Sequence, residues 1–329
     1  MKRKYSLIII LVFVFFFSSC ELMVQQEPEG VIRIVSVGID YADIAAVSPN
    51  LNSTCNDAYQ VGQVLKALGE KEGTEVELYY LLSEHDGQTI MDEFNGFQNN
   101  TSIYYPSKNN FSIILNYIQS KQKSQDRLFI FFAGHGIEVS GINEFELIYG
   151  DDLSDSYSFV MPLNKGQTDI GISKYLYDLS EYLDLVETIP GKKVLLNDFC
   201  YSGALVSDDY ISLDLTTYFY ANHPSTADLL FSSSSEKVLD DIYILAAAQS
   251  YQESFEDYQH GNFTRALLDG LGWDETNQVL TTIPASSIFL NSEKIYLSKL
   301  ANYTKKNDKN GRQTPRMTTS SNDIVLFDF

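Results

Sequence analysis

Residues 128–136 read LFIFFAGHG, and they decide how the rest of the chain is interpreted. An uninterrupted apolar run is typical of a strand buried on both faces, and here it ends in a histidine between two glycines. Residues 194–203 read VLLNDFCYSG, a second apolar run that ends in an acid, a cysteine and a small-residue turn. Reactive groups collect at the carboxyl ends of strands in open parallel sheets. We therefore expect His135 and Cys200 at one sheet edge.

Similar apolar runs recur along the chain and predict further buried strands. The predicted strands are 31–39, 76–82, 127–133, 193–197, 242–247 and 324–327. Segments with helical spacing lie between them, at 57–68, 111–118, 172–186 and 263–271. This alternation predicts an α/β fold, a three-layer α/β/α sandwich with a mainly parallel central sheet. The irregular stretch 207–241 is predicted to be a long loop inside one domain of residues 31–329.

Composition and charge exclude several classes of protein. The chain has 329 residues with 23 Lys+Arg and 44 Asp+Glu, which gives a formal charge of −21. So negative a chain is not expected to bind nucleic acid, since nucleic-acid binding depends on basic residues that contact phosphates. With 44% hydrophobic and 20% charged residues, the chain is globular and is not a multi-span membrane protein. Three cysteines are too few for a disulfide scaffold of this length.

The first twenty residues have the pattern of an export signal. Three basic residues at 2–4 precede an apolar run at 7–17, and Ser18-Ser19-Cys20 follows. This pattern resembles a bacterial lipobox, so we expect a signal peptide at 1–19, a lipidated Cys20 and a polar tether at 20–30. The protein is then anchored in the bacterial cell envelope, with its domain outside the cytoplasm and a mature charge of −21 − 3 = −24. A plain secretory signal or an N-terminal anchor helix are the alternatives.

A thiol and an imidazole at neighbouring strand ends form the pair that nucleophilic catalysis needs. A thiol becomes a strong nucleophile only when a nearby base removes its proton. The alternative is that His135 caps a turn and Cys200 is a small buried apolar residue, but the shared setting favours a catalytic pair. A bond between Cys55 and Cys200 is conceivable, yet we interpret both as free thiols. His85, His223 and His260 lack this setting and are expected to be exposed loop residues, and no zinc motif is evident.

Several motifs, in order along the chain, resemble the caspase-like peptidases and especially their bacterial metacaspase-like members. The matching segments are VSVGIDY at 35–41, CNDA at 55–58, GHG at 134–136, DFCYSG at 198–203, AAA at 246–248, GNFTRAL at 261–267 and QTP at 313–315. The resemblance implies a caspase-like fold and a cysteine-type endopeptidase, with Cys200 as nucleophile and His135 as the general acid and base. It also implies an oxyanion hole formed by the N–H groups of Gly136 and Cys200. No third member of a triad is evident.

The departures from the family pattern bear on rate and specificity. Tyr201 replaces the histidine most often found after the nucleophile, and the Gln-Ala-Cys-x-Gly signature of animal caspases is missing. The metacaspase-like resemblance implies cleavage after Arg or Lys, with Asp57 and Asp198 as the substrate-binding acids. Two alternatives remain: Asp57 at a helix start caps that helix, and Asp198 supports the fold by hydrogen bonding.

Further expectations concern cofactors, self-cleavage, substrates and an alternative function. We expect no required cofactor and no metal in the chemistry; calcium activation through Asp151-Asp152 and Asp208-Asp209 is the alternative. No Lys or Arg lies between Lys193 and Lys237, so self-cleavage in this loop by a basic-specific enzyme would follow Lys237. The substrates would be peptides or proteins with basic residues. A catalytically inactive, lipid-anchored binding module with the caspase fold is the alternative function.

Overall fold

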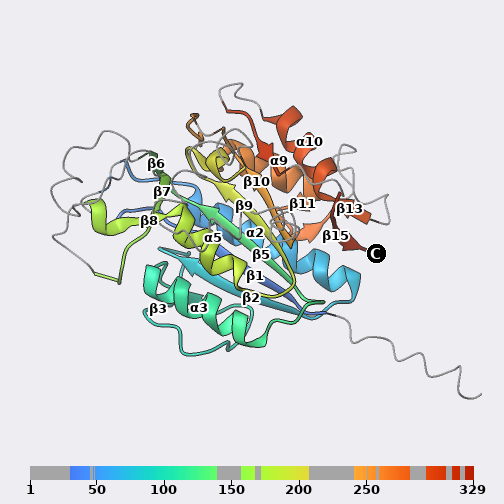
Figure 1. The fold of residues 1–329 in the computed structure, drawn as a ribbon, viewed down its shortest axis with the longest axis horizontal. Helices are drawn as coiled ribbons and strands as arrows, with labels where there is room; N and C mark the ends of the chain where they lie inside the picture. Colours follow the sequence, from blue (N-terminus) through green and yellow to red (C-terminus); the bar gives the residue numbers. More distant parts are fainter. Residues whose placement is uncertain are drawn as a thin grey trace, which may run out of the picture.

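A central sheet of eight strands forms the middle of the computed structural model (Figure 1). Its strands are β1 (Ile32–Gly38), β2 (Val76–Leu82), β3 (Ile90–Met91), β4 (Ile103–Tyr104), β5 (Arg127–Ala133), β9 (Lys192–Asp198), β10 (Ile242–Ala246) and β14 (Arg316–Met317). Their order is β14-β10-β9-β5-β1-β2-β4-β3, and all neighbours are parallel except β10 and β14. The structure describes residues 30–44, 47, 49–138, 157–166, 172–206, 241–249, 251–256, 259–281, 294–308, 313–318 and 323–329.

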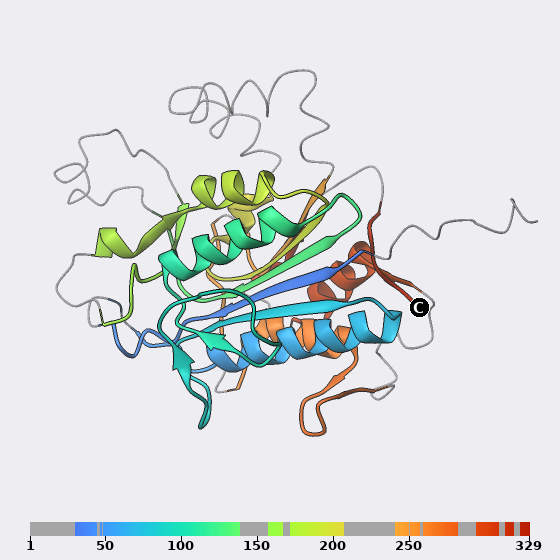
Figure 2. The same cartoon turned by 90° about the horizontal axis from the view of Figure 1, so that it is seen from below.

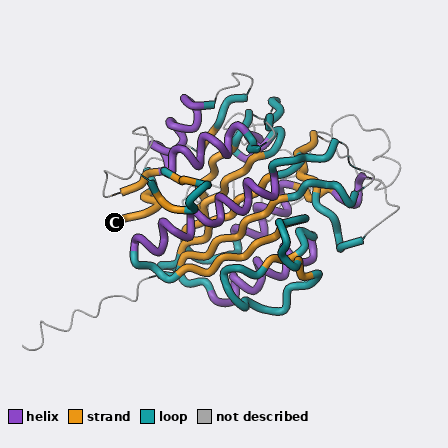
Figure 3. Tube along the Cα trace, turned by 180° about the vertical axis from the view of Figure 1, so that it is seen from behind, coloured by secondary structure: helices purple, strands orange, loops and turns teal. Residues whose placement is uncertain are grey.

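Helices cover both faces of this sheet. The helices α3 (Lys108–Lys121) and α5 (Leu179–Glu187) lie on one face. On the other face lie α2 (Thr54–Glu72), α9 (Asn262–Leu271) and α10 (Leu297–Asn307) (Figure 2). The same layering is visible from behind, where helices cross in front of the strands (Figure 3). The predicted α/β fold with a mainly parallel sheet between helical layers is confirmed.

The alternation of side chains along the central strands builds two separate cores. In β5, Leu128, Ile130 and Phe132 belong to the core beneath α3 and α5, whereas Phe129 and Phe131 belong to the core beneath α2 and α9. The period of two that governs any strand explains this division. In β9, Val194 and Leu196 belong to the core under α2 and α9. By the same alternation, Asp198 at the end of this strand lies on the side of α2 and α9.

Smaller sheets surround the central one. A three-stranded antiparallel sheet contains β6 (Gly136–Glu138), β7 (Tyr157–Val160) and β8 (Leu176–Asp178). Two antiparallel pairs join β11 (Trp273–Asp274) to β12 (Val279–Leu280) and β13 (Lys294–Tyr296) to β15 (Val325–Asp328). Because β6 begins at Gly136, the three-stranded sheet carries the chain away directly after His135.

Two of the predicted elements differ from the structure. The expected helix 172–186 is divided into a 3₁₀ turn η1 (Ile172–Tyr175), strand β8 and the shorter helix α5. Pairing of β8 with β7 overrides the helical spacing here, and the rings of Phe159 and Tyr177 stack at 5.0 Å between their centroids. The expected strand 324–327 exists as β15, but it pairs with β13 outside the central sheet.

The N-terminal predictions fall outside the described residues. The signal peptide, Cys20 and most of the tether lie there, and β1 begins at Ile32, close to the predicted domain start. None of the helices in the described part of the chain combines the length and apolar character needed to cross a membrane.

Candidate active site

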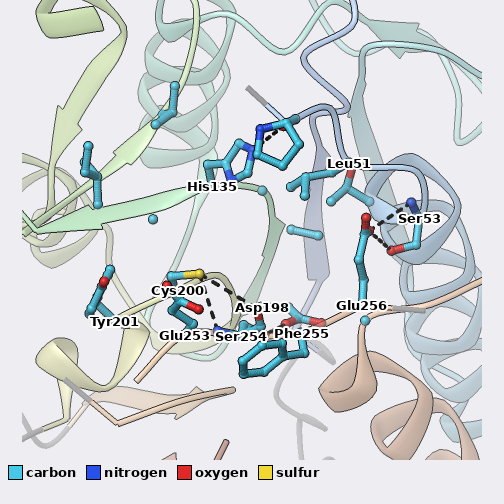
Figure 4. Close-up of a pocket in the computed structure, with 18 of the residues that line it drawn as sticks. Leu51, Ser53, His135, Asp198, Cys200, Tyr201, Glu253, Ser254, Phe255 and Glu256 are labelled. Carbon is cyan, nitrogen blue, oxygen red and sulfur yellow. Dashed lines mark hydrogen bonds between the residues drawn. The ribbon is translucent and has the colours of Figure 1, made fainter. Parts of the chain in front are cut away.

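His135 and Cys200 emerge from two neighbouring strands at one edge of the sheet. β5 and β9 pair in parallel with Ala133 opposite Asp198, and each reactive residue follows two positions later. The backbone N–H of Gly134 donates to the carbonyl oxygen of Asp198 at 3.3 Å, so the chains stay together as they leave the sheet. The two side chains lie on facing walls of one pocket (Figure 4). The expectation that they share a sheet edge is confirmed.

A backbone carbonyl orients the imidazole of His135. Nε2 lies 2.7 Å from the carbonyl oxygen of Pro49. Because a carbonyl only accepts, this contact places the proton on Nε2 and leaves the lone pair of the neutral ring on Nδ1. The backbone N–H of His135 donates to the hydroxyl of Tyr41 at 2.7 Å, and this hydroxyl donates to the carbonyl of Val160 at 2.9 Å. The ring is therefore held as a base, and Pro49 is an orienting group that the sequence did not indicate.

The thiol of Cys200 is partly buried and is held by one neighbouring residue. The backbone N–H of Ser254 donates to Sγ at 3.4 Å, and Sγ lies 3.8 Å from the carbonyl oxygen of the same residue. Burial raises the pKa of the Cys200 thiol above its ordinary value. Among the described residues, no hydrogen bond joins this thiol to His135. The thiol is therefore protonated at rest and needs a base, and His135 is the basic side chain across the pocket.

Gly136 lets the two strand-end loops touch each other. A Cβ atom at this position would lie 2.0 Å from the carbonyl oxygen of Cys200 and 2.8 Å from the ring of Phe199. The next residue after the thiol, Tyr201, adopts the left-handed conformation with φ at 61°, and its N–H donates to the carbonyl of Gln252 at 2.8 Å. Tyr201 lines the pocket, so the residue that replaces the usual histidine forms an aromatic wall.

The pocket between these loops has a volume of about 770 Å³, within the usual range for small-molecule sites. Its lining contains all the residues predicted for the site, namely Asp57, His135, Gly136, Asp198 and Cys200. It contains three more carboxylates, those of Glu138, Glu253 and Glu256. No lysine or arginine is among the described residues that line it. The pocket therefore concentrates negative charge beside the thiol.

Asp57 and Asp198 meet at the deep end of this pocket, although they come from α2 and β9. They are 1% and 6% exposed. Oδ2 of Asp57 accepts from the N–H of Gly261 at 2.8 Å. Asp198 accepts from the hydroxyls of Ser254 and Thr264, each at 2.6 Å. Burial raises the pKa of both carboxyls, and that of Asp57 reaches about 7.

These contacts bear on the two alternatives for the acids. The N-cap position of α2 belongs to Ser53, and the carboxylate of Asp57 binds outside its own helix. Capping is therefore not the role of Asp57. Asp198 does tie β9 to the 251–256 segment and to α9, so it supports the fold by hydrogen bonding. That role does not conflict with its place in the pocket lining.

His260 contradicts the expectation of an exposed loop histidine. It is 4% exposed, with Nδ1 2.5 Å from Oδ1 of Asp57 and Nε2 2.9 Å from Oε2 of Glu275. Burial alone would lower the pKa of this histidine, but its hydrogen bonds to the two carboxylates raise it to about 9. The sequence contained one signal that this histidine lies near the site, because it comes directly before the matching segment GNFTRAL at 261–267. His85 is half-buried and stacks on Tyr59, and His223 lies outside the described residues.

Glu256 is a second residue that the sequence did not single out. Its carboxylate accepts from the N–H groups of Asn52 and Ser53 and from the hydroxyl of Ser53, at 3.1, 3.2 and 2.6 Å. Negative charge is favourable at the start of a helix, which explains the position. Glu256 comes shortly after Ser254, whose N–H donates to the Cys200 thiol. It thereby joins the segment beside the thiol to the start of α2, the helix that carries Asp57.

Other predicted residues lie outside the described part of the chain. These are Cys20, the acids Asp151, Asp152, Asp208 and Asp209, and Lys237 with most of the loop 207–241. In the described ranges, no cluster of three or more His, Cys, Asp or Glu side chains is arranged to hold a metal ion. Cys55 and Cys200 are both free thiols, as expected.

The fold and the pocket place this chain among α/β proteins in which a thiol and an imidazole lie at the ends of neighbouring parallel strands. The chain belongs to the caspase family, since the family model described as Caspase domain matches residues 35–323. Membership of this family points to a cysteine peptidase that acts on proteins.

Other comparisons address only the fold. A crystal structure of a protein from Geobacter sulfurreducens, a structural genomics target, is similar with a TM-score of 0.51. The match covers 90% of this chain and 94% of that protein at 12% sequence identity, which supports the fold alone. No protein with a curated description matches the chain.

Proposed function

We propose that this protein is a cysteine endopeptidase of the cell envelope that cleaves peptides after Arg or Lys. The observation that supports this most directly is the single pocket holding Cys200, His135 and the carboxylates of Asp57 and Asp198. A nucleophile, a base and a charged recognition site are the three parts that such a peptidase needs. The family match supports the reaction class, and the acidic lining supports the preference for basic side chains.

In the proposed reaction, Nδ1 of His135 takes the proton from the Cys200 thiol, and the sulfur attacks the peptide carbonyl carbon. The resulting oxyanion is stabilised by the N–H groups of Gly136 and Cys200, and one such donor typically contributes about 3 kcal/mol. The imidazolium then donates its proton to the leaving amine as the C–N bond breaks. Water, deprotonated by the same imidazole, hydrolyses the thioester and releases the acid product.

The proposed specificity follows from the charge of the pocket. A guanidinium or ammonium group that enters the deep end would meet Asp57 and Asp198, which are already desolvated by the fold. A preorganised carboxylate pair favours a cation, and Arg would gain most because its fork of N–H donors matches carboxylate oxygens. An acidic substrate side chain would be repelled by the same groups.

The proposed location rests on the N-terminal sequence. The signal pattern and Cys20 favour a lipid anchor, which would present the domain on the outer side of a bacterial membrane. Where the enzyme matures by cutting its own loop, the proposed cleavage position follows Lys237. Cleavage that persists in a Lys237→Ala variant would exclude this position.

The proposal can be tested with purified full-length protein in detergent, with and without calcium and reductant. Fluorogenic peptides ending in Arg, Lys or Asp are the substrates, and Cys200→Ala and His135→Ala are the matched variants. Cleavage after Arg or Lys that disappears in both variants is the expected result. Cleavage only after Asp would overturn the roles of Asp57 and Asp198, and the absence of cleavage would favour the binding-module alternative.

Thiol labelling provides a readout that needs no substrate. Burial raises the pKa of Cys55 to about 12, so this thiol should react slowly with iodoacetamide in any case. Cys200 should react faster than Cys55, and His135→Ala should slow Cys200 several-fold if the imidazole activates it. Equal slow labelling of both thiols, unchanged by His135→Ala, would indicate a non-catalytic protein.

A further inference from the structure

A buried histidine links Asp57 in the pocket lining to a carboxylate that is partly exposed to solvent. His260 contacts Asp57 through Nδ1 and Glu275 through Nε2, at 2.5 and 2.9 Å. Glu275 lies in the turn between β11 and β12, and its side chain is 37% exposed. Of the two partners, Asp57 is the one that lines the pocket of Cys200. The proposed mechanism uses neither His260 nor Glu275.

The pocket places two carboxylates where both are hard to ionise at once. Gly261 lies between them, because a Cβ atom there would be 2.2 Å from Oδ2 of Asp198 and 3.3 Å from Oδ2 of Asp57. Two like charges in a desolvated site disfavour each other, and one of them tends to bind a proton. A nearby cation removes this conflict. Among the groups described around Asp57, His260 is the side chain in contact that can carry positive charge.

We propose that His260 is a positioning residue for substrate recognition, whose imidazolium keeps the carboxylate of Asp57 ionised and correctly oriented toward a basic substrate side chain. Glu275 stabilises the imidazolium from the outer side. The inference rests on the proposed preference for Arg or Lys and names the residue that maintains it. The orientation follows from the contacts, since Oδ1 of Asp57 is engaged by His260 and Oδ2 by the N–H of Gly261.

The charged groups around this pair set its pH dependence. Asp57 from α2 and Glu275 from the β11–β12 turn contact the imidazole, Asp198 from β9 acts on it through Asp57, and Asp274 lies beside Glu275. Burial and the charge of Asp198 raise the pKa of Asp57, while the imidazolium lowers it, with a net value of about 7. Loss of the imidazolium would therefore raise the pKa of Asp57 further and leave it neutral at neutral pH.

The test compares two substrates that differ only in charge. One peptide has Arg before the scissile bond, and the other has citrulline, which has nearly the same shape but is neutral. The ratio of their kcat/KM values cancels the titration of Cys200 and His135. For the full-length protein this ratio should rise with pH along a limb centred near 7. His260→Gln should lower it about tenfold at pH 7 and move the limb upward by about one pH unit or more, with citrulline kcat unchanged within about twofold.

The controls separate a charge effect from a structural one. His85→Gln removes a half-buried histidine that does not line the pocket and should leave the ratio and the limb unchanged. If His260→Gln does not fold, His260→Lys decides, because it keeps a positive charge. A folded His260→Lys with the wild-type ratio supports the proposal. Equal kcat/KM values for the Arg and citrulline peptides in a folded His260→Lys variant overturn the proposal. An unaltered pH limb in His260→Gln also overturns it.

A binding measurement distinguishes failure of this inference from failure of the proposed function. Agmatine, a guanidinium compound without a carboxylate, is titrated calorimetrically into full-length Cys200→Ala with and without His260→Gln. Binding that weakens about tenfold at pH 7 in the double variant supports the role of His260, even if wild-type protein cleaves no peptide. Equal binding by the two proteins overturns that role while leaving a basic-specific peptidase intact. No agmatine binding at any pH overturns both.

Discussion

Gly136 sets how closely the loop of the histidine approaches the loop of the thiol. Substitution by alanine would place Cβ 2.0 Å from the carbonyl oxygen of Cys200, which is closer than any real contact, so one loop has to move. A displacement near 1 Å of a catalytic group typically reduces the rate about a hundredfold. We therefore expect Gly136→Ala to lose about that factor in kcat/KM, measured with an Arg peptide.

The matched control for this substitution is Gly87→Ala. Gly87 has φ at +67° and nothing within 4 Å of its hypothetical Cβ, so the variant tests backbone strain alone. Its free energy of unfolding should be lower by about 1 kcal/mol, measured by urea unfolding, with kcat/KM unchanged. Equal activity in the two glycine variants would show that contact between the loops does not position the thiol.

At the residue level, the sequence predicted those site residues that follow a recognisable strand. His135 and Cys200 each end an apolar run, and Asp57 and Asp198 are placed within known motifs. Pro49, Glu256 and His260 were not predicted, because their roles depend on contacts over long separations in the chain. The contact between His260 and Asp57 joins residues 203 positions apart, and no local pattern specifies such a pair.

At the level of elements, the central strands were predictable because they are buried on both faces. Which strand pairs with which was not predictable. β2 and β5 have the predicted bounds, because each consists mainly of apolar residues, with Glu77 and Arg127 near the strand starts. The segment 172–186 contains apolar residues at helical spacing, yet β8 within it pairs with β7. β15 has the composition of a central strand and pairs instead with β13. Both outcomes depend on tertiary neighbours, which override local propensity.

Arg33 joins the start of the central sheet to the turn before β5. It is 4% exposed and contacts Glu77 and Asp126, each at 2.8 Å, and Gln122 at 3.0 Å. Burial acts to raise the pKa of Asp126, but the N–H groups of Val31 and Lys123 and the guanidinium lower it below its ordinary value. The network therefore holds two strand starts and one turn together through one buried cation.

Arg33→Met should destabilise the fold by about 3–5 kcal/mol, because the buried carboxylate of Asp126 and the partly buried one of Glu77 then lose their shared cation. Urea unfolding at neutral pH measures this. The matched control is Lys66→Met, which removes the exposed pair of Lys66 and Glu70 within α2 and should change stability by less than about 0.5 kcal/mol. A similar small change in both variants would mean that the Arg33 network adds little beyond packing.

At the scale of the whole molecule, charge affects how fast substrates arrive. The chain has a formal charge of −21, and the described lining of the pocket contains no lysine or arginine. Such a field accelerates the approach of cations, and salt screens it over about 10 Å at 0.1 M. We expect kcat/KM for a peptide with two basic residues to fall several-fold between about 0.02 M and about 0.5 M salt. The citrulline analogue serves as control, and an equal fall for it would exclude steering.

The pair of His260 and Asp57 also makes the stability of the whole fold depend on pH. The pKa of His260 is raised from 6.5 to about 9, so folded protein binds this proton more tightly than unfolded protein does. The stabilisation is fully present below pH 6.5 and is lost as the pH rises through about 9. Asp57, raised from 3.8 to about 7, acts in the same direction at lower pH.

Urea unfolding of the wild-type protein should therefore show a loss on the order of 2–3 kcal/mol between about pH 6.5 and pH 9.5. In His260→Gln the loss between about pH 8.5 and pH 9.5 should nearly disappear, since no imidazole remains to lose its proton there and Asp57 titrates at lower pH. His85→Gln is the control, because burial lowers the pKa of His85 and any linkage from it lies at lower pH. If the slope persists in His260→Gln, the alkaline loss comes from other groups, and the imidazole of His260 is neutral in the folded protein.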